Sequence, residues 1–215
     1  MTPISGMIWI RFYLTAVRFH CRTSKEKLVV RLGEHNWRAH TEPLPHKDYD
    51  VDEIIVHDGY DWSKVNFTAP YDIALLRLSE PAEIKKHIKT IDLPWESIHE
   101  TFLGKKARFT GWGRLGDNKT QPSVLQRIDM DVIKGNFEDD DGDDVVTISA
   151  TAGWCFKGLC EGDSGGPLTL TKDGKQVPVG VLSGGKTPCD GFRRGREVFA
   201  RVTYFLDWID EHTVS

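Results

Sequence analysis

The stretch Cys160-Glu161-Gly162-Asp163-Ser164-Gly165-Gly166-Pro167 holds a serine between glycines, with an aspartate directly before it. Glycine adopts backbone angles that other residues reach only at a cost, and it lets a substrate approach the main chain closely. A nucleophilic serine needs such a turn, because neighbouring backbone N–H groups can stabilise a developing oxyanion. A glycine-rich surface turn would have a similar composition, so the nucleophile hypothesis requires a base elsewhere in the chain.

His20 and Asp72 are the best candidates for the base and for its orienting carboxylate. His20 follows a mostly apolar stretch, and Asp72 opens the apolar run Ile73–Leu78. A serine hydroxyl becomes a strong nucleophile when an imidazole takes its proton, and a carboxylate fixes the tautomer of that imidazole. The order His20, Asp72, Ser164 therefore predicts nucleophilic acyl transfer by a catalytic triad.

The same serine turn also satisfies the G-x-S-x-G pattern of α/β-hydrolases, from Gly162 to Gly166. That pattern requires a helix directly after the serine, with the histidine last in the chain order. Here Pro167–Leu170 has the composition of a strand, and His212 is the only histidine after the serine. These features exclude the α/β-hydrolase interpretation.

The composition is that of a globular protein of one or two domains. The 215 residues include 28 basic and 32 acidic residues, which gives a net charge of −4. The chain therefore lacks the excess of positive charge that is typical of a nucleic-acid-binding protein. No run of 18 apolar residues predicts a membrane span. Four cysteines can support a disulfide or two, and the sequons at Asn66 and Asn118 are glycosylation candidates that agree with an extracellular protein.

Short strand-like runs separated by turn residues predict an all-β fold. The runs are Lys27–Leu32, Glu53–His57, Ile73–Leu78, Ala107–Thr110, Val145–Ile148, Pro167–Leu170, Val177–Leu182 and Val198–Val202. Only Val202–His212 has a helical period. We expect Met7–Val17 to be a buried strand, because Arg11 interrupts it and it lacks the flanks of a signal peptide. The acidic run Glu138–Asp144 predicts a solvated loop, because it lacks the ligand spacing of a Ca²⁺ loop.

Six motifs in order resemble the trypsin-like (chymotrypsin-fold) serine proteases, from about Leu14 to the C-terminus. They are Leu14-Thr15-Ala16 with His20-Cys21, Val30-Arg31-Leu32-Gly33-Glu34, Asp72-Ile73-Ala74-Leu75-Leu76, Gly111-Trp112-Gly113, Gly162-Asp163-Ser164-Gly165-Gly166-Pro167 and Gly180-Val181-Leu182-Ser183. A helix ending in Trp208-Ile209 completes the series. The resemblance implies two packed six-stranded antiparallel β-barrels followed by a C-terminal helix. We place the division near Pro94, which gives subdomains 1–94 and 95–215, and we expect the first barrel to be incomplete at its N-terminus.

The resemblance also assigns roles to individual residues. It implies His20 as general base, Asp72 as its orienter and Ser164 as nucleophile, with the N–H groups of Gly162 and Ser164 as the oxyanion hole. A disulfide between Cys160 and Cys189 would lie beside the specificity pocket. No metal and no cofactor are expected.

The specificity pocket departs from that of trypsin. The resemblance implies pocket positions at Gly158, Ser183, Gly185 and Glu197. Trypsin itself has an aspartate where this chain has Gly158, and a glycine is usual where it has Glu197. A carboxylate entering from the back wall predicts a mixed preference for basic and large apolar P1 side chains. The alternative is that Arg194 or Arg196 pairs with Glu197 outside the pocket.

Other departures leave two functions open. In the family, an Ile-Val-Gly-Gly-like segment about forty residues before the histidine supplies an amine that pairs with the residue matching Asp163, and no such segment precedes His20. Gly184 stands where a groove tryptophan is usual, and Cys155 has no obvious mate. The first hypothesis is a monomeric, secreted endopeptidase that acts on proteins or peptides and binds protein inhibitors. The alternative is a non-catalytic homologue that serves as a binding or regulatory module.

Overall fold

The structure is a computed structural model. It describes residues 7–9, 11–17, 25–39, 41–61, 70–115, 120–134, 146–153, 158–185 and 195–213. The strands are β1 (Met7–Trp9), β2 (Phe12–Thr15), β3 (Val29–Leu32), β4 (Lys47–Val56), β5 (Ala74–Leu78), β6 (Lys106–Gly111), β7 (Gln126–Lys134), β8 (Thr147–Thr151), β9 (Pro167–Lys172), β10 (Lys175–Gly185) and β11 (Glu197–Arg201). The helices are the 3₁₀ turns η1 (Lys25–Lys27), η2 (Trp95–Ser97) and η3 (Val202–Tyr204), and the α-helix α2 (Leu206–Thr213).

The first half of the chain forms a five-stranded antiparallel sheet in the order β1-β2-β5-β4-β3. The ten-residue β4 serves two partners, because its first half pairs with β3 and its second half pairs with β5. A register shift between Val51 and Glu53 separates these two halves, as expected where a bulge bends a strand. The sheet curves around the apolar side chains of Leu32, Tyr49 and Leu76, which are almost fully buried.

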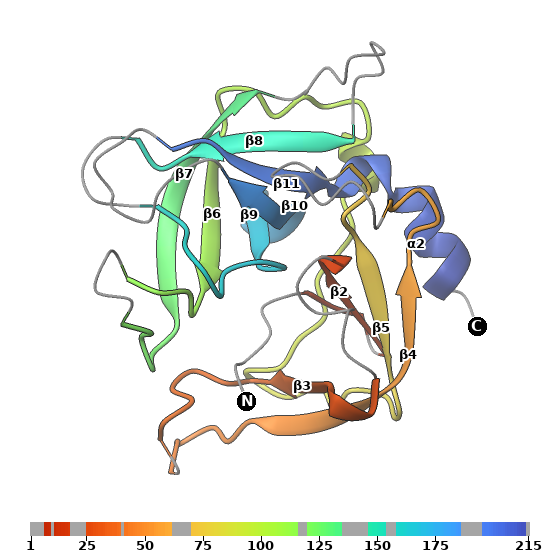
Figure 1. Cartoon of the computed structure of the whole chain (residues 1–215), viewed down its shortest axis with the longest axis vertical. Helices are drawn as coiled ribbons and strands as arrows, with labels where there is room; N and C mark the ends of the chain where they lie inside the picture. Colours follow the sequence, from red (N-terminus) through yellow and green to blue (C-terminus); the bar gives the residue numbers. More distant parts are fainter. Residues whose placement is uncertain are drawn as a thin grey trace.

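The second half closes into a barrel in the order β10-β11-β8-β7-β6-β9, with β9 pairing back onto β10 (Figure 1). Its interior is filled by Phe109, Ile148, Leu168 and Phe199, each no more than 2% exposed. Gly180 on β10 faces this core closely, since a Cβ there would lie 2.8 Å from the Cβ of Phe199. The strand alternation thus places large side chains inside and leaves room for them.

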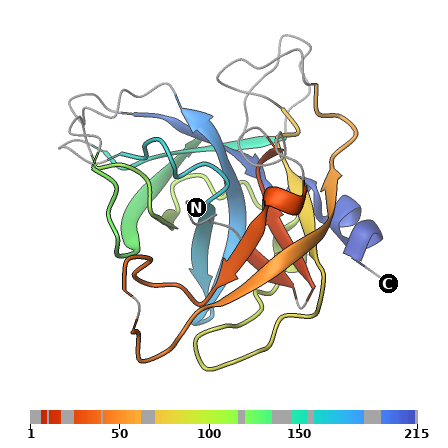
Figure 2. The same ribbon diagram turned by 60° about the horizontal axis from the view of Figure 1, so that its bottom comes forward.

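The C-terminal helix α2 ties the two halves together. It follows the last barrel strand, yet Phe205 and Ile209 pack with Leu14 and Leu75 of the first sheet in one apolar core. Figures 1 and 2 show α2 beside β4 and β5 in both views. The helical period of the sequence is confirmed, although Val202–Tyr204 forms the 3₁₀ turn η3 rather than the start of the α-helix.

The all-β fold class is confirmed, with two corrections to individual elements. Met7–Val17 is not one strand: it is the hairpin β1–β2, which turns at Arg11, the residue that interrupts the apolar run. Strand β7 was not predicted, although it alternates between inward apolar residues (Ile128, Met130, Val132) and outward charged ones. Its many charges obscured that period. The expected strand after Ser164 is present as β9, in agreement with the exclusion of an α/β-hydrolase.

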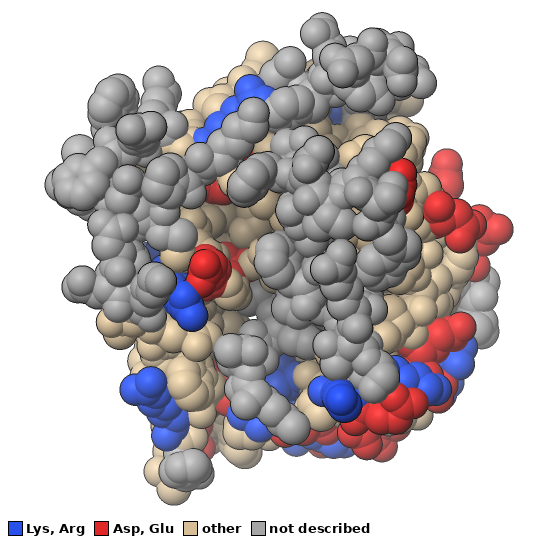
Figure 3. Space-filling model, viewed as in Figure 1, with Lys and Arg blue, Asp and Glu red and all other residues tan. Residues whose placement is uncertain are grey.

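Among the described residues, no helix is both long and apolar enough to cross a membrane. Acidic and basic side chains are intermixed at the lower right of Figure 3, around β3 and β4. Ion pairs between β3, β4 and β5 include Arg31 with Asp48 and Arg77 with both Asp52 and Glu53. The predicted boundary near Pro94 falls in the connection between β5 and β6 and stays a prediction, while the acidic run Glu138–Asp144 lies outside the described residues.

Candidate active site

Asp72 lies just before β5 and is fully buried. Its Oδ2 accepts a hydrogen bond of 2.7 Å from the hydroxyl of Ser183 on β10. Ser183 is the extra residue where the pairing of β10 with β11 shifts register between Leu182 and Gly184. Because a bulge re-aims a side chain, it directs this hydroxyl out of the barrel strand towards the first half of the chain. One buried hydrogen bond therefore joins the two halves at Asp72.

The serine turn departs from regular structure at its glycines. Gly162 and Gly165 have φ angles of +97° and +82°, a region that favours residues without a Cβ. The N–H of Gly166 donates to the carbonyl of Asp163 at 2.9 Å, which closes the turn around the half-buried Ser164. The N–H of Gly165 donates to the carbonyl of Leu182 at 2.8 Å. This bond anchors the turn to β10, one residue before Ser183.

The Asp163 carboxylate points inward, away from the exposed side of the turn, and is 7% exposed. Its two oxygens accept hydrogen bonds from the N–H of Gly113 at 2.8 Å and from the N–H of Cys160 at 3.0 Å. Burial raises the pKa of Asp163 to about 6, while the two backbone hydrogen bonds act in the opposite direction. Across the described part of the chain, no cationic side chain forms an ion pair with this carboxylate. Among the described residues, only backbone dipoles therefore stabilise the desolvated Asp163 carboxyl group.

Glycine is required beside this carboxylate. A Cβ on Gly113 would overlap the carboxyl group of Asp163, and a Cβ on Gly111 would also overlap it. The Gly111-Trp112-Gly113 motif thus opens a space that Asp163 occupies. Gly113 and Asp163 belong to two separate sequence motifs, and only the fold shows that the absence of a side chain at Gly113 makes room for the Asp163 carboxyl group.

The predicted pocket residues Gly185 and Glu197 are paired across β10 and β11. Glu197 is 5% exposed, and a Cβ on Gly185 would overlap its carboxylate. The side chain therefore lies directly against the backbone of Gly185. Gly158 is exposed, and a Cβ there would meet no atom of the described residues within 4 Å.

An ion pair on the rim of the serine turn was missed from the sequence. The guanidinium of Arg114 pairs with the carboxylate of Glu161, and the N–H of Arg114 donates to the Glu161 carbonyl at 2.9 Å. These contacts connect the segment after β6 to the turn that carries Ser164. No sequence pattern signals them, because the two residues are 47 positions apart.

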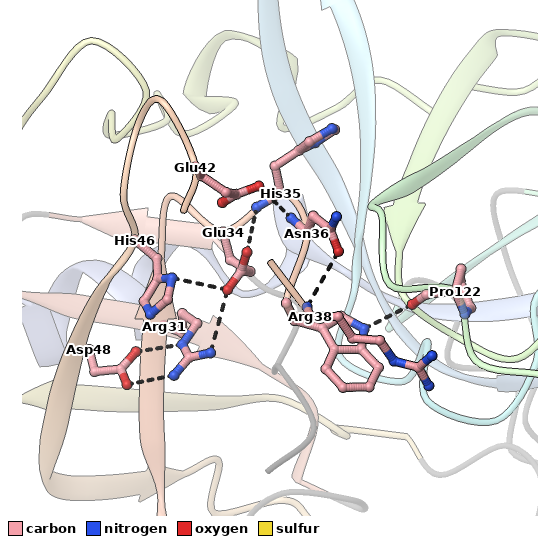
Figure 4. Close-up of polar contacts among 10 residues, drawn as sticks. Arg31, Glu34, His35, Asn36, Arg38, Glu42, His46, Asp48 and Pro122 are labelled. Carbon is pink, nitrogen blue, oxygen red and sulfur yellow. Dashed lines mark hydrogen bonds and ion pairs between the residues drawn. The ribbon is translucent and has the colours of Figure 1, made fainter. Parts of the chain in front are cut away.

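A second set of contacts between the two halves, here called the Trp37 clasp, involves Trp37, His35 and the segment before β7, and Figure 4 includes its contact at Pro122. The indole Nε1 of Trp37 donates to the carbonyl of Pro122 at 2.8 Å, and its backbone N–H donates to the carbonyl of Ser123 at 3.0 Å. The N–H of Leu125 donates to the carbonyl of His35 at 2.8 Å. The loop after β3 is thus fastened to the segment before β7.

A buried carboxylate organises the base of this loop and also belongs to a group with metal-ligand types. Glu34, Glu42 and His46 bring one possible ligand atom each to within 4.8 Å of one another. However, Oε2 of Glu34 already lies 3.1 Å from His46 Nδ1 and 3.4 Å from a guanidinium nitrogen of Arg31 (Figure 4). Arg31 supplies the positive charge that a metal would bring, so we assign the group to the loop rather than to a metal.

Four of the predicted site residues lie outside the described residues: His20, Cys189, Asn66 and Asn118. Cys160 is disulfide-bonded, and the other three cysteines are outside the described residues, so its pairing with Cys189 stays a prediction. Asp72 and the turn of Ser164 are both hydrogen-bonded to β10. Asp72 accepts a hydrogen bond from Ser183, and Gly165, next to Ser164, donates one to the carbonyl of Leu182.

The fold and the site together define a class of protein: an all-β fold in which a glycine-bounded serine turn and a buried aspartate are each hydrogen-bonded to strand β10. The family model described as Trypsin matches residues 11–209, and the chain belongs to that family. Serine proteinase stubble of Drosophila melanogaster is 32% identical over 192 residues, covering 85% of this chain and 23% of that protein. Vitamin K-dependent protein C of Oryctolagus cuniculus is 30% identical, covering 96% of this chain and 45% of that protein.

Two further relatives are a glandular kallikrein and a protein named as an inactive serine protease. Glandular kallikrein of Sus scrofa is 28% identical and covers 94% of this chain and 81% of its own length. Inactive CLIP domain-containing serine protease A28 of Anopheles gambiae is 29% identical and covers 99% of this chain and 56% of its own length. The chain spans less than half the length of stubble and of protein C.

Proposed function

We propose that this chain is a serine endopeptidase that cleaves peptide bonds through an acyl-enzyme. Ser164 would attack the scissile carbonyl, His20 would take its proton, and Asp72 would hold the imidazole in the productive tautomer. The N–H groups of Gly162 and Ser164 would receive the oxyanion. Membership of the trypsin family supports this reaction class.

The observation that carries the proposal is that Asp72 and the turn of Ser164, two members of the proposed triad, are hydrogen-bonded to adjacent residues of β10. The Ser183 hydroxyl holds the buried Asp72 carboxylate, and the carbonyl of the preceding Leu182 holds the turn of Ser164 through Gly165. A buried carboxylate is costly unless it is hydrogen-bonded. A triad requires its aspartate and its serine to be held in fixed positions, and these contacts to β10 agree with that requirement.

The position of Glu197 supports a mixed P1 preference. Its nearly buried carboxylate lies against Gly185, so a basic P1 side chain that entered the pocket could form a charge-assisted hydrogen bond. Without a charged P1 group, the same pocket would accept a large apolar side chain. Glu197→Gln should reduce cleavage after Arg and Lys by about 10- to 100-fold, the worth of a hydrogen bond to a charged group, and leave cleavage after Phe nearly unchanged.

Labelling by a fluorophosphonate probe tests the reaction class directly. The wild-type protein should be labelled and Ser164→Ala should not, while the exposed Ser79→Ala variant serves as a matched control that keeps full labelling. Labelling that persists in Ser164→Ala would refute the nucleophile assignment. A fluorogenic peptide panel then tests the pocket, and cleavage confined to small P1 residues would reject the mixed preference.

The alternative function is a non-catalytic homologue that binds or regulates. The Asp163 carboxylate favours it, because among the described residues only backbone N–H groups of Gly113 and Cys160 stabilise it. A folded wild-type protein that the probe does not label would support this alternative. In either case we propose an extracellular location, since the disulfide at Cys160 needs an oxidising compartment.

A further inference from the structure

Tyr71, the residue before Asp72, holds a backbone conformation that its side chain disfavours. Its φ angle is +62°, in the left-handed region that is unusual for a bulky aromatic residue. The N–H of Ile73 donates to the Tyr71 carbonyl at 2.7 Å, so Asp72 is the central residue of a three-residue turn. The direction of the Asp72 side chain therefore depends on the backbone that Tyr71 maintains. Such a conformation persists only where the surrounding structure fixes it.

The ring of Tyr71 is fixed by the imidazole of His57. The two rings are stacked, with centroids 5.0 Å apart and an interplanar angle of 20°. On its other sides the Tyr71 ring contacts Phe205 and Tyr204 edge-on, each with centroids 6.1 Å away. Gly59 lies beneath the ring, since a Cβ there would approach the Tyr71 Cγ to 2.9 Å. The ring thus has little room to move.

His57 is itself oriented by its neighbours. Its Nδ1 accepts a hydrogen bond of 3.0 Å from the N–H of Gly59, which requires the proton of the neutral imidazole to be on Nε2. Its backbone N–H donates to the carbonyl of Ile73 at 3.2 Å, so the same residue also holds the far side of the Asp72 turn. Phe205 and Trp208 pack against its ring, each at 5.1 Å.

We propose that His57 is a positioning residue that sets the orientation of Asp72 through the ring and backbone of Tyr71. The inference deepens the proposed function and rests on Asp72 acting as the orienter of the base. The effect of His57 is exerted on the turn between Tyr71 and Ile73, where its ring and its backbone N–H both make contacts.

The effect of losing this stack should fall on the chemical step. A displacement of about 1 Å in a catalytic group can reduce a rate by about 100-fold. Ser183 still holds Asp72 in a His57 variant, so we expect a smaller loss. His57→Ala should lower kcat, measured per probe-titrated active site, by about tenfold with KM within about twofold of wild type. His57→Phe keeps a stacking ring and should recover most of that loss.

A second histidine in the same aromatic cluster provides a matched control. His212 packs on Trp208 with ring centroids 5.0 Å apart. His212→Ala should lower thermal stability to a similar extent as His57→Ala and leave kcat per active site unchanged. Equal losses of kcat in the two alanine variants, or none in His57→Ala, would overturn the positioning role.

Amide hydrogen exchange at Ile73 separates failure of this inference from failure of the proposed function. The Ile73 N–H closes the turn around Asp72, so its exchange should accelerate in His57→Ala and in Gly59→Ala, and stay slow in His57→Phe and His212→Ala. This measurement needs no catalytic activity. If the wild type is not labelled by the probe, the proposed protease function fails, and unchanged Ile73 exchange in His57→Ala would then reject the positioning role separately.

Discussion

Replacing Asp163 with asparagine should change how the stability of the protein depends on pH. In the native state the pKa of Asp163 is about 6, against an ordinary value of 3.8, chiefly because the carboxyl group is buried. A shift of one pKa unit corresponds to about 1.4 kcal/mol, so the shift of about two units amounts to about 3 kcal/mol. Asparagine has the same shape and cannot ionise, so it removes this contribution at every pH.

The sign follows from the raised pKa. The folded protein binds the proton of Asp163 more tightly than the unfolded chain does, so the protonated group stabilises the fold. That stabilisation is fully present below pH 3.8 and is lost as the pH rises through about 6. The difference in unfolding free energy, wild type minus Asp163→Asn, should therefore fall by about 2.5 kcal/mol between pH 4 and pH 7.5, which is most of the total.

Urea unfolding followed by tryptophan fluorescence measures this difference at each pH, and a ¹³C NMR titration of the carboxyl group checks the pKa itself. Asp129→Asn is a suitable control, because the hydrogen bond from Arg108 lowers the pKa of Asp129, so its contribution is lost only as the pH falls below 3.8 and its difference should stay nearly flat between pH 4 and pH 7.5. A flat or rising difference for Asp163→Asn would refute the reasoning. It would mean that a cation reaches the carboxylate in the native protein and keeps it ionised.

Three further changes test other contacts. Ser183→Ala removes the hydroxyl that holds the buried Asp72 carboxylate. A hydrogen bond to a charged group contributes about 1.5 kcal/mol, so kcat per probe-titrated site should fall by about tenfold. An unchanged kcat would argue against the role of this hydrogen bond. Gly113→Ala places a methyl group against Asp163 and should lower the unfolding free energy by about 1–3 kcal/mol in calorimetry or urea titration. Gly158→Ala should be nearly neutral, because a Cβ there would meet no atom of the described residues within 4 Å. Trp37→Phe removes the indole hydrogen bond of the clasp and should reduce stability by about 1 kcal/mol in the same assay, with no loss if that bond is absent in solution.

Much of the fold follows from residue order, because its elements have strong local patterns. Strand β9 was predictable from Pro167–Leu170, and the helical tail from the spacing of Phe205 and Ile209, which both proved buried. The hairpin β1–β2 was not separated into two strands, since its apolar run is nearly continuous. The resemblance of the motifs to a known family then indicated the class of protein and the candidate site residues, which secondary-structure propensity alone does not indicate.

The environment of those residues was not predictable, because it arises from contacts between distant segments. The sequence gives no sign that Ser183 is the extra residue of a bulge, or that Gly113 opens space for the carboxyl group of Asp163. The left-handed backbone of Tyr71 is also hidden, because tyrosine rarely adopts it and only the packing around its ring explains it. The assignments of His20 and Cys189 remain predictions from the motifs.

The first sheet is open and the second is a closed barrel, so the two halves should differ in their tendency to aggregate. Within the described residues, the six strands of the second half form a closed ring, whereas β1 and β3 are the outermost strands of the first sheet. An outermost strand presents backbone N–H and C=O groups that can pair with another molecule. We therefore expect intermolecular strand pairing under mild heating to begin in the first half. On β3, the charge of Arg31 and its pair with Asp48 oppose such pairing, so weakening that ion pair should accelerate aggregation.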